Sequence, residues 1–136
     1  MPFPVDERFI VETEKKLGVR FPVSFRLKMM EENGGDVITD PDEWQLHPFF
    51  DTSDKTRIKR TCNDIVRETA SARVWTGFPQ TAVAIGSNGS GDQLILLPSQ
   101  GTTALQEAVF WWDHETGTVH KIAEDFTKLN IGRTSA

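Results

Sequence analysis

Three glycines, Gly86, Gly89 and Gly91, have the spacing of a loop that binds phosphate through backbone N–H groups. Such loops lead from a strand into the N-terminus of a helix, where free N–H groups and the helix dipole hold the anion. Here an apolar run at 93–97 follows, which is typical of a strand, and no Lys or Ser/Thr stands in the nucleotide-binding position. The pattern therefore predicts no phosphate site.

The same loop is better explained as the tight connection of a β-hairpin. We expect Gly89 and Gly91 to adopt the positive φ angles that glycine tolerates, and Asn88 or Asp92 to accept hydrogen bonds from loop N–H groups. The residues that we predict to have a structural role in turns are Gly34, Gly86, Gly89, Gly91 and Asp92.

Acidic and histidine side chains gather between 113 and 120, where they suggest metal ligands. A two-residue turn at Thr116-Gly117 would place Asp113 opposite His120 and leave His114 on the other face. Two ligands are too few for zinc, which takes three or four from the protein. We therefore expect an exposed hairpin tip, with no metal and no cofactor.

Nucleophilic catalysis would need Cys62 or a serine beside a histidine and an orienting acid. Lys59, Arg60 and Arg67 lie near Cys62 in the sequence and would lower a thiol pKa, but the spacing of Cys62 from apolar neighbours indicates a small core residue. None of the three histidines has a local partner that indicates a triad. We expect no catalytic residue and interpret the protein as not an enzyme.

The segment Phe110-Trp111-Trp112 is a candidate for recognition, since tryptophan is enriched at binding hot spots. In a strand, successive side chains point to opposite faces. We expect one of these tryptophans in the core and the other under a helix or at the rim.

A chain of 136 residues, with 4 Trp and 9 Phe, has the material for one core, so residues 1–136 are interpreted as a single domain. Its single cysteine cannot form an internal disulfide, and its N-terminus lacks the pattern of a signal peptide. No apolar run reaches the ~18 residues that a membrane helix needs. These features predict a cytoplasmic protein with no membrane contact.

The charges are unevenly distributed along the chain. The net charge of −5 disfavours direct binding of nucleic acid. No Lys or Arg stands between Lys28 and Lys55, or from Val74 to His120. An acidic surface in the first interval would attract a basic protein partner, whereas a solvated acidic loop is the plainer alternative. The candidate partner-binding residues are Glu32, Asp36, Asp40, Asp42, Glu43, Asp51 and Asp54.

The first part of the chain predicts helices. Asp6 is a candidate N-cap of a helix that Gly18 ends, and Phe21-Pro22 begins a second helix. This second helix ends at Asn33-Gly34-Gly35, where Gly34 would take the left-handed C′ conformation. Residues 52–72 read as one polar surface helix.

The rest of the chain predicts strands at about 36–39, 44–49, 81–86, 93–97, 108–113 and 118–122, with Asp40-Pro41-Asp42 as a turn. Residues 123–129 read as a short closing helix, and 131–136 as a frayed tail. Strands joined by hairpins imply a mainly antiparallel sheet. Together with N-terminal helices packed on one side, they predict the α+β class.

An ordered set of segments resembles the SUKH superfamily, which includes the yeast SMI–KNR type cell-wall regulators and many small bacterial proteins. The resemblance covers nearly the whole chain, except 39–74. The segments that carry it are Leu17-Gly18-Val19-Arg20-Phe21-Pro22-Val23-Ser24-Phe25, Asn33-Gly34-Gly35, Val83-Ala84-Ile85-Gly86, Ser90-Gly91-Asp92, Leu94-Ile95-Leu96, Val109-Phe110-Trp111-Trp112-Asp113-His114-Glu115 and Ile122-Ala123-Glu124-Asp125-Phe126.

This resemblance implies an α+β domain and, for bacterial members, a non-enzymatic immunity protein that neutralises a toxin domain, often a nuclease. The expected partner is a cognate toxin domain with a basic surface. A regulatory interaction module without a toxin partner is the alternative, and a small enzyme or ligand-binding protein is a third. We expect a monomer or a weak homodimer.

Overall fold

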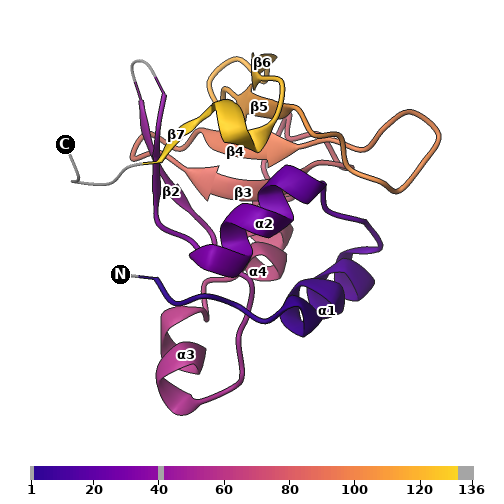
Figure 1. Cartoon of the computed structure of the whole chain (residues 1–136). Helices are drawn as coiled ribbons and strands as arrows, with labels where there is room; N and C mark the ends of the chain where they lie inside the picture. Colours follow the sequence, from indigo (N-terminus) through magenta and orange to yellow (C-terminus); the bar gives the residue numbers. More distant parts are fainter. Residues whose placement is uncertain (1, 40–41, 132–136) are drawn as a thin grey trace.

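The computed structural model describes residues 2–39 and 42–131 (Figure 1). Asp40 and Pro41, predicted to form a turn, lie outside the described residues. The helices are α1 (Glu7–Leu17), α2 (Val23–Glu31), α3 (Lys55–Arg60), α4 (Ile65–Ala72) and the short 3-10 helix η1 (Phe126–Lys128). The strands are β1 (Asp36–Ile38), β2 (Glu43–Leu46), β3 (Val83–Ser87), β4 (Gln93–Leu96), β5 (Val109–Trp112), β6 (Val119–Ala123) and β7 (Asn130–Ile131).

These strands form one sheet in the order β6-β5-β4-β3-β2-β1-β7, and each described pairing is antiparallel. From β1 to β6 each strand pairs with the next one in the chain, so the six form a meander. β7 then returns to the edge of β1, where Ile131 lies opposite Val37. The predicted α+β class is confirmed, but Ile131 is part of a strand and not of a frayed tail.

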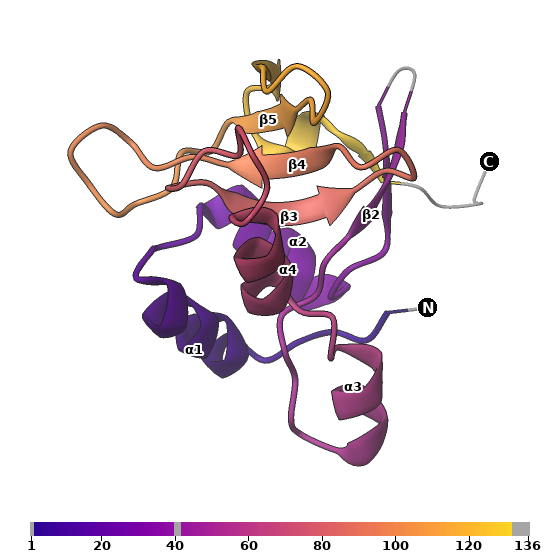
Figure 2. The ribbon, with the colours of Figure 1, turned by 180° about the vertical axis from the view of Figure 1, so that it is seen from behind.

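Different parts of the chain pack on the two faces of the sheet. On one face, α2 and η1 lie over the strands (Figure 1), and Phe25 and Met29 of α2 pack into a cluster with Ile85 and Leu94. The alternate residues of the strands, including Ile95 of β4, form a second, smaller cluster on the other face. Seen from behind, that face is crossed by the segment between α4 and β3 (Figure 2). The two central strands are therefore apolar on both sides.

The first two helices confirm the predicted signals. The Asp6 carboxylate accepts a hydrogen bond from the Arg8 N–H at 2.9 Å and caps α1, and Gly18 ends α1 with φ +69°. Pro22 is the N-cap of α2. In α2, Leu27 is exposed while Phe25 is fully buried, as the helical spacing predicts.

The prediction of one helix over 52–72 is wrong, because the chain forms two helices with a break between them. Asp54 and Asp64 each cap a separate helix by accepting a backbone N–H three residues on. The break at 61–64 leaves Cys62 exposed, which corrects its assignment to the core. The predicted closing helix at 123–129 is likewise reduced to η1, since β6 extends to Ala123.

A threonine of α4 completes the sheet where β2 leaves it. β2 pairs with only the last two residues of β3, Gly86 and Ser87. Further along β3, the Ala84 N–H donates to Thr69 Oγ1 at 3.0 Å instead. Thr69 is fully buried. A buried backbone N–H without a partner is costly, so this hydroxyl fixes α4 against β3.

Candidate functional site

Of the seven acids predicted to bind a partner, three lie close to basic side chains of the fold itself. Glu32 is buried, and its carboxylate lies 3.9 Å from Lys28 Nζ. Arg57 lies between Asp51 and Asp54, with its guanidinium 3.5 Å from the buried carboxylate of Asp51 and 2.6 Å from that of Asp54. These contacts compensate much of the charge that a partner would meet there.

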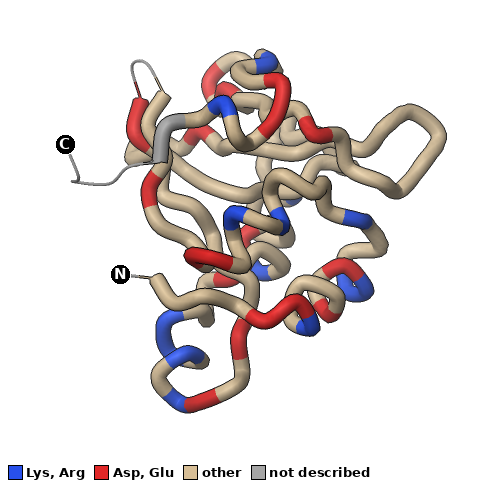
Figure 3. The backbone as a smooth tube through the Cα atoms, in the orientation of Figure 1, with Lys and Arg blue, Asp and Glu red and all other residues tan. Residues whose placement is uncertain are grey.

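The other described acids of this set, Asp36, Asp42 and Glu43, belong to the β1–β2 hairpin, while Asp40 lies outside the described residues. Asp36 and Glu43 are exposed and Asp42 is half-buried. No ion pair joins these three acids to a basic group within the described ranges 2–39 and 42–131. Figure 3 shows acidic and no basic residues along the described part of this hairpin.

Strand register gathers two of these acids on one side of the hairpin. Asp36 pairs with Gln45, and Ile38 with Glu43, and all four side chains are exposed. The alternate residues, such as Trp44, are buried in the core. We call the set Asp36, Ile38, Glu43 and Gln45 the hairpin face. It combines two carboxylates with one exposed apolar side chain.

The hairpin face continues across the sheet through directly paired residues. Gln45 lies opposite Ser87, Ser87 opposite Gln93, and Gln93 opposite Trp112. Residues directly opposite each other share a face of the sheet. Asp36 and Trp112 therefore lie on the same side of the sheet, in one row that continues from Trp112 to Val119 of β6.

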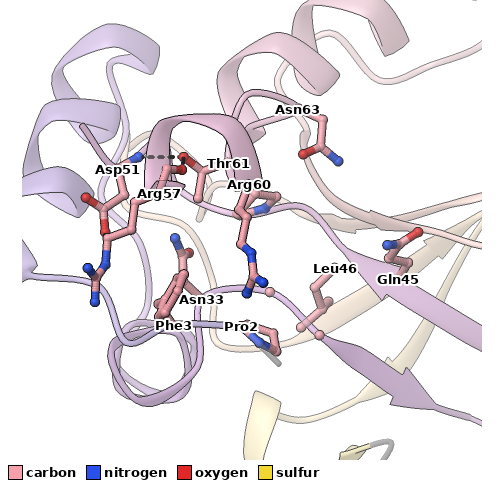
Figure 4. A pocket seen from close by; sticks show the side chains of 13 residues that line it. Pro2, Phe3, Asn33, Gln45, Leu46, Asp51, Arg57, Arg60, Thr61 and Asn63 are labelled. Atoms are coloured by element: carbon pink, nitrogen blue, oxygen red, sulfur yellow. Dashed lines mark hydrogen bonds and ion pairs between the residues drawn. The ribbon is translucent and has the colours of Figure 1, made fainter. Parts of the chain in front are cut away.

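A pocket of about 340 Å³ lies beside the hairpin face, between α3 and the N-terminal segment (Figure 4). The Phe3 ring forms part of its lining, and the guanidinium carbons of Arg57 and Arg60 lie 4.3 and 4.9 Å from the ring centroid. Other lining residues include Gln45 of the hairpin face and Asn63. We call this the α3 pocket.

Two polar side chains of the α3 pocket, those of Thr61 and Asn33, hold the fold together. Thr61 Oγ1 donates to the Arg57 carbonyl at 2.7 Å and accepts from the Asp51 N–H at 2.9 Å. Asn33 makes two hydrogen bonds to the Phe49 backbone, both at 2.8 Å. A hydroxyl used in this way is not activated as a nucleophile, which needs an adjacent base. The pocket is suited to binding.

A second hollow, which the sequence did not single out, lies where the segment after α4 crosses the sheet. Its lining is Val74, Trp75, Thr76, Gly91, Trp112 and His114. Trp75 stacks on Trp112 with ring centroids 5.9 Å apart and planes inclined by 16°. We call it the Trp75 pocket. The long interval without Lys or Arg was a visible signal, but only the fold brings these aromatic residues together.

Comparison with protein-family models gives a match to the SMI1 / KNR4 family (SUKH-1) over residues 4–130. The chain belongs to the SMI1/KNR4 family. The resemblance inferred from the motifs is thus confirmed. No curated protein and no solved structure matches the chain at a significant level. Each helix in the described part of the chain is too short or too polar to cross a membrane.

Among the residues that carried the resemblance to the SMI1/KNR4 family, Asp92 joins two turns. Its Oδ1 accepts from the His114 N–H at 3.0 Å and lies 2.5 Å from His114 Nδ1, and its Oδ2 accepts from Trp111 Nε1 at 3.0 Å. Asp92 thereby ties the β3–β4 connection to the end of β5. Sequence spacing missed this link, because 22 residues separate Asp92 from His114.

The contact between Asp92 and His114 shifts the pKa values of both side chains. Burial works to raise the pKa of Asp92, but hydrogen bonds from His114, Trp111 and Asn88 together hold it below its usual value. The hydrogen bond to Asp92 raises the pKa of His114, against a smaller effect of burial. At His47, burial lowers the pKa more than Gln93 and Glu68 raise it.

The predicted arrangement of the hairpin tip is wrong in its register. His120 lies opposite Trp111, and Asp113 bonds through its backbone N–H to the Thr118 carbonyl. A ligand atom of Asp113 does lie within 4.8 Å of those of Asp92 and His114. Both Asp92 oxygens already accept hydrogen bonds from the protein, however, so we interpret this cluster as structural.

The predicted turn glycines have different roles. Gly91 has φ +101°, as predicted, and the same is true of Gly34 at +117°, although Gly34 lies past the extended C-cap of α2 rather than at C′. Gly89 does not have a positive φ, so that prediction is wrong. Asn88 Oδ1 accepts the loop N–H groups of Ser90 and Asp92. Gly86 is needed for another reason, since a Cβ there would lie 3.1 Å from a β2 carbonyl.

Proposed function

We propose that this member of the SMI1/KNR4 family is a non-enzymatic immunity protein. It would bind a toxin domain with a basic surface and neutralise it in the cytoplasm of the producing cell. Membership of the family supports the proposal, and the observation that carries it is the hairpin face. There Asp36 and Glu43 are exposed on paired strands, and no ion pair among the described residues compensates them.

The proposed mechanism is occlusion of the toxin's substrate site. A nuclease holds phosphates with basic side chains, so its substrate site has a positive potential. Carboxylates placed on a paired hairpin can meet these side chains without first being ordered, which lowers the entropic cost of binding. Ile38 lies next to Asp36 on the same face of β1 and opposite Glu43, is 42% exposed, and would supply an apolar contact.

Within the seven acids predicted from the sequence, we assign the partner contact to Asp36, Asp42 and Glu43. Glu32, Asp51 and Asp54 lie against Lys28 or Arg57, so they would contribute less to the field that a partner meets. Charges that meet a partner mainly raise the association rate and make it depend on salt. This property separates the two groups of acids experimentally.

A growth-rescue assay tests the function. The C-terminal toxin domain encoded by the adjacent upstream gene is expressed in a laboratory host, with and without this chain. We expect killing that this chain alone reverses. If the toxin domain kills and the chain does not rescue growth, the immunity proposal fails for that toxin.

Association kinetics test the surface. In the double variant Asp36→Asn/Glu43→Gln, we expect the association rate with the toxin to fall about five- to twentyfold at low salt, and to depend less steeply on salt. Glu12→Gln on α1 is the matched control, because Glu12 is exposed on a helix away from the hairpin (Figure 1). Equal rates for the double variant and the control would remove the hairpin face from the proposal.

The alternative is a regulatory interaction module without a toxin partner, which the same family match also supports. It predicts that the upstream gene product does not kill, and that the chain binds a host protein instead. Purification of the chain from its own cells, with the Asp36→Asn/Glu43→Gln variant as a control, would separate the two.

A further inference from the structure

The Trp75 pocket offers an aromatic surface that is held in place before any partner arrives. Val74 and Trp75 are 80% and 43% exposed, whereas Trp112 beneath them is 1% exposed. Trp112 is fixed by a 3.0 Å hydrogen bond from its Nε1 to the Gly77 carbonyl, and the Phe78 ring packs edge-on at 5.1 Å. Trp75 therefore rests on a rigid indole.

The hollow is large enough for a long side chain. Its volume is about 550 Å³, and its lining is mostly apolar, with His114 at one side. A pocket with an exposed, preorganised tryptophan is the kind of site where binding energy concentrates in protein interfaces. One face of the Trp75 indole stacks on Trp112, and 43% of the residue is exposed.

The electrostatics around the Trp75 pocket indicate the charge of its occupant. No Lys or Arg occurs from Val74 to His120, the segment that supplies the whole lining. Asp92 is paired with the His114 ring at the edge of the pocket, and two further acids, Glu115 and Asp113, also act on His114. Arg73, the adjacent residue in the chain, donates to the Ala82 carbonyl and is not part of the lining. An anionic occupant would be repelled and a cationic one attracted.

We propose that the Trp75 pocket receives an arginine or lysine side chain of a basic protein partner. The guanidinium or ammonium group would lie over the indole face of Trp75, because a cation is attracted to the face of an aromatic ring and tryptophan is the strongest such ring. Asp113 and Glu115 would balance its charge, while Val74 would contact the aliphatic stem.

This site deepens the proposed function, on which it rests for the expectation that the partner is basic. The paired row from Asp36 through Gln45, Ser87 and Gln93 to Trp112 spans four strand spacings, which is about 19 Å. An interface of standard size covers about 800 Å² on each partner, enough to include both ends of this row. One partner can thus contact the hairpin face and the Trp75 pocket together.

The test uses the full chain and a hexa-arginine peptide, and does not require the toxin. In the Asp36→Asn/Glu43→Gln background, which removes the charge of the hairpin face, we expect the peptide to shift the Trp75 indole N–H signal in a saturable way. A hexa-glutamate peptide should leave that signal unchanged. A Trp75 signal that hexa-arginine does not move, or that both peptides move equally, would overturn the proposal.

Two variants measure the contribution of the pocket in the same background, by fluorescence anisotropy of labelled hexa-arginine. Trp75→Ala should weaken binding about two- to fivefold, and Glu115→Gln should weaken it less and reduce its salt dependence. Leu27→Ala is the matched control, since Leu27 is an exposed apolar residue on α2, which covers the other face of the sheet (Figure 1). Equal affinity for Trp75→Ala and Leu27→Ala would exclude the site.

The result is independent of the rescue assay. Peptide binding at Trp75 with no rescue from any toxin would leave the site standing as a contact for another basic protein, and would reject the immunity proposal. Rescue that persists in Trp75→Ala, together with unaltered peptide binding, would reject the site and keep the immunity proposal.

Discussion

Replacing Asp92 by Asn tests the link between the two turns. Asp92 accepts from Trp111 Nε1 on one oxygen and from the His114 N–H on the other, both at 3.0 Å. An asparagine has one acceptor oxygen, so its amide N–H₂ group must face a donor on one side. The side chain is 11% exposed, which leaves little room for water to compensate.

The magnitude follows from these contacts. A buried donor without a partner costs about 1–3 kcal/mol, and the lost charge weakens the remaining bonds by a further ~1 kcal/mol. We therefore expect Asp92→Asn to lower the free energy of unfolding by about 2–4 kcal/mol. For a chain of this length, this corresponds to a fall in Tm of roughly 6–15 °C.

The effect should depend on pH in a defined direction. The pKa of Asp92 is lowered in the folded state, so its stabilisation is present above the unfolded value of about 4 and is lost as the pH falls. The pKa of His114 is raised, so its stabilisation is present below about 6.5 and is lost as the pH rises through the folded value. The ion pair contributes most between about pH 4 and 6.5.

Urea unfolding of the wild type and Asp92→Asn at pH 5.5 and 8.5 measures both effects. The wild type should exceed Asp92→Asn in free energy of unfolding by more at pH 5.5 than at pH 8.5. His114→Gln is the companion variant, because it removes the charged pair and leaves the backbone N–H and Trp111 bonds. His114→Gln should abolish the part of the pH dependence that comes from the Asp92–His114 pair, and it should lower the free energy of unfolding less than Asp92→Asn does. If Asp92→Asn lowers the free energy of unfolding by less than ~0.5 kcal/mol, or by the same amount at both pH values, this account is refuted.

Three further substitutions test other parts of the fold. Thr69→Val keeps the side-chain shape but leaves the buried Ala84 N–H without its 3.0 Å acceptor, so urea unfolding should show a loss of about 1–3 kcal/mol. Gly86→Ala places a Cβ 3.1 Å from the Gln45 carbonyl oxygen and should cost about 1–3 kcal/mol by the same measurement. Cys62→Ser should change stability by less than ~0.5 kcal/mol, and the Cys62 thiol of the native protein should react fully with a thiol reagent.

Local signals in the sequence were sufficient for most of the elements. Asp6 and Gly18 mark the ends of α1 because capping depends on a few neighbouring residues. The apolar runs at 81–86 and 93–97 predict central strands, and β3 (Val83–Ser87) and β4 (Gln93–Leu96) are buried on both faces. Trp112 is buried under the segment after α4, and Trp111 is half-buried, in line with the interpretation of Phe110-Trp111-Trp112 as largely structural.

The predictions that the structure corrects concern features that depend on contacts between residues distant in the sequence. The pattern predicts one helix over 52–72, but the capping bond of Asp64 begins a second helix, and Cys62 is exposed in the break before it. The sequence shows where an acidic residue stands, but it does not show which basic side chain of the fold lies close enough to compensate its charge. Asp51 lies in an acidic interval, yet it meets Arg57 only because α3 folds back over it. The candidate surface consequently narrows to the hairpin.

The order of the strands also sets an order of folding. From β1 to β6 every strand pairs with its neighbour in the chain. The β3–β4 and β5–β6 pairs are joined by short loops and should form quickly, whereas α3 and α4 lie between β2 and β3. Among the described strand pairs, the pairing of β7 with β1 closes the longest stretch of chain, with Val37 opposite Ile131 across 94 residues. That closure has the highest entropic cost and comes with just two paired residues. The amide protons of β7 should therefore exchange with solvent earlier than those of β3 and β4. In that case β7 separates from β1 by local opening, without unfolding of the meander.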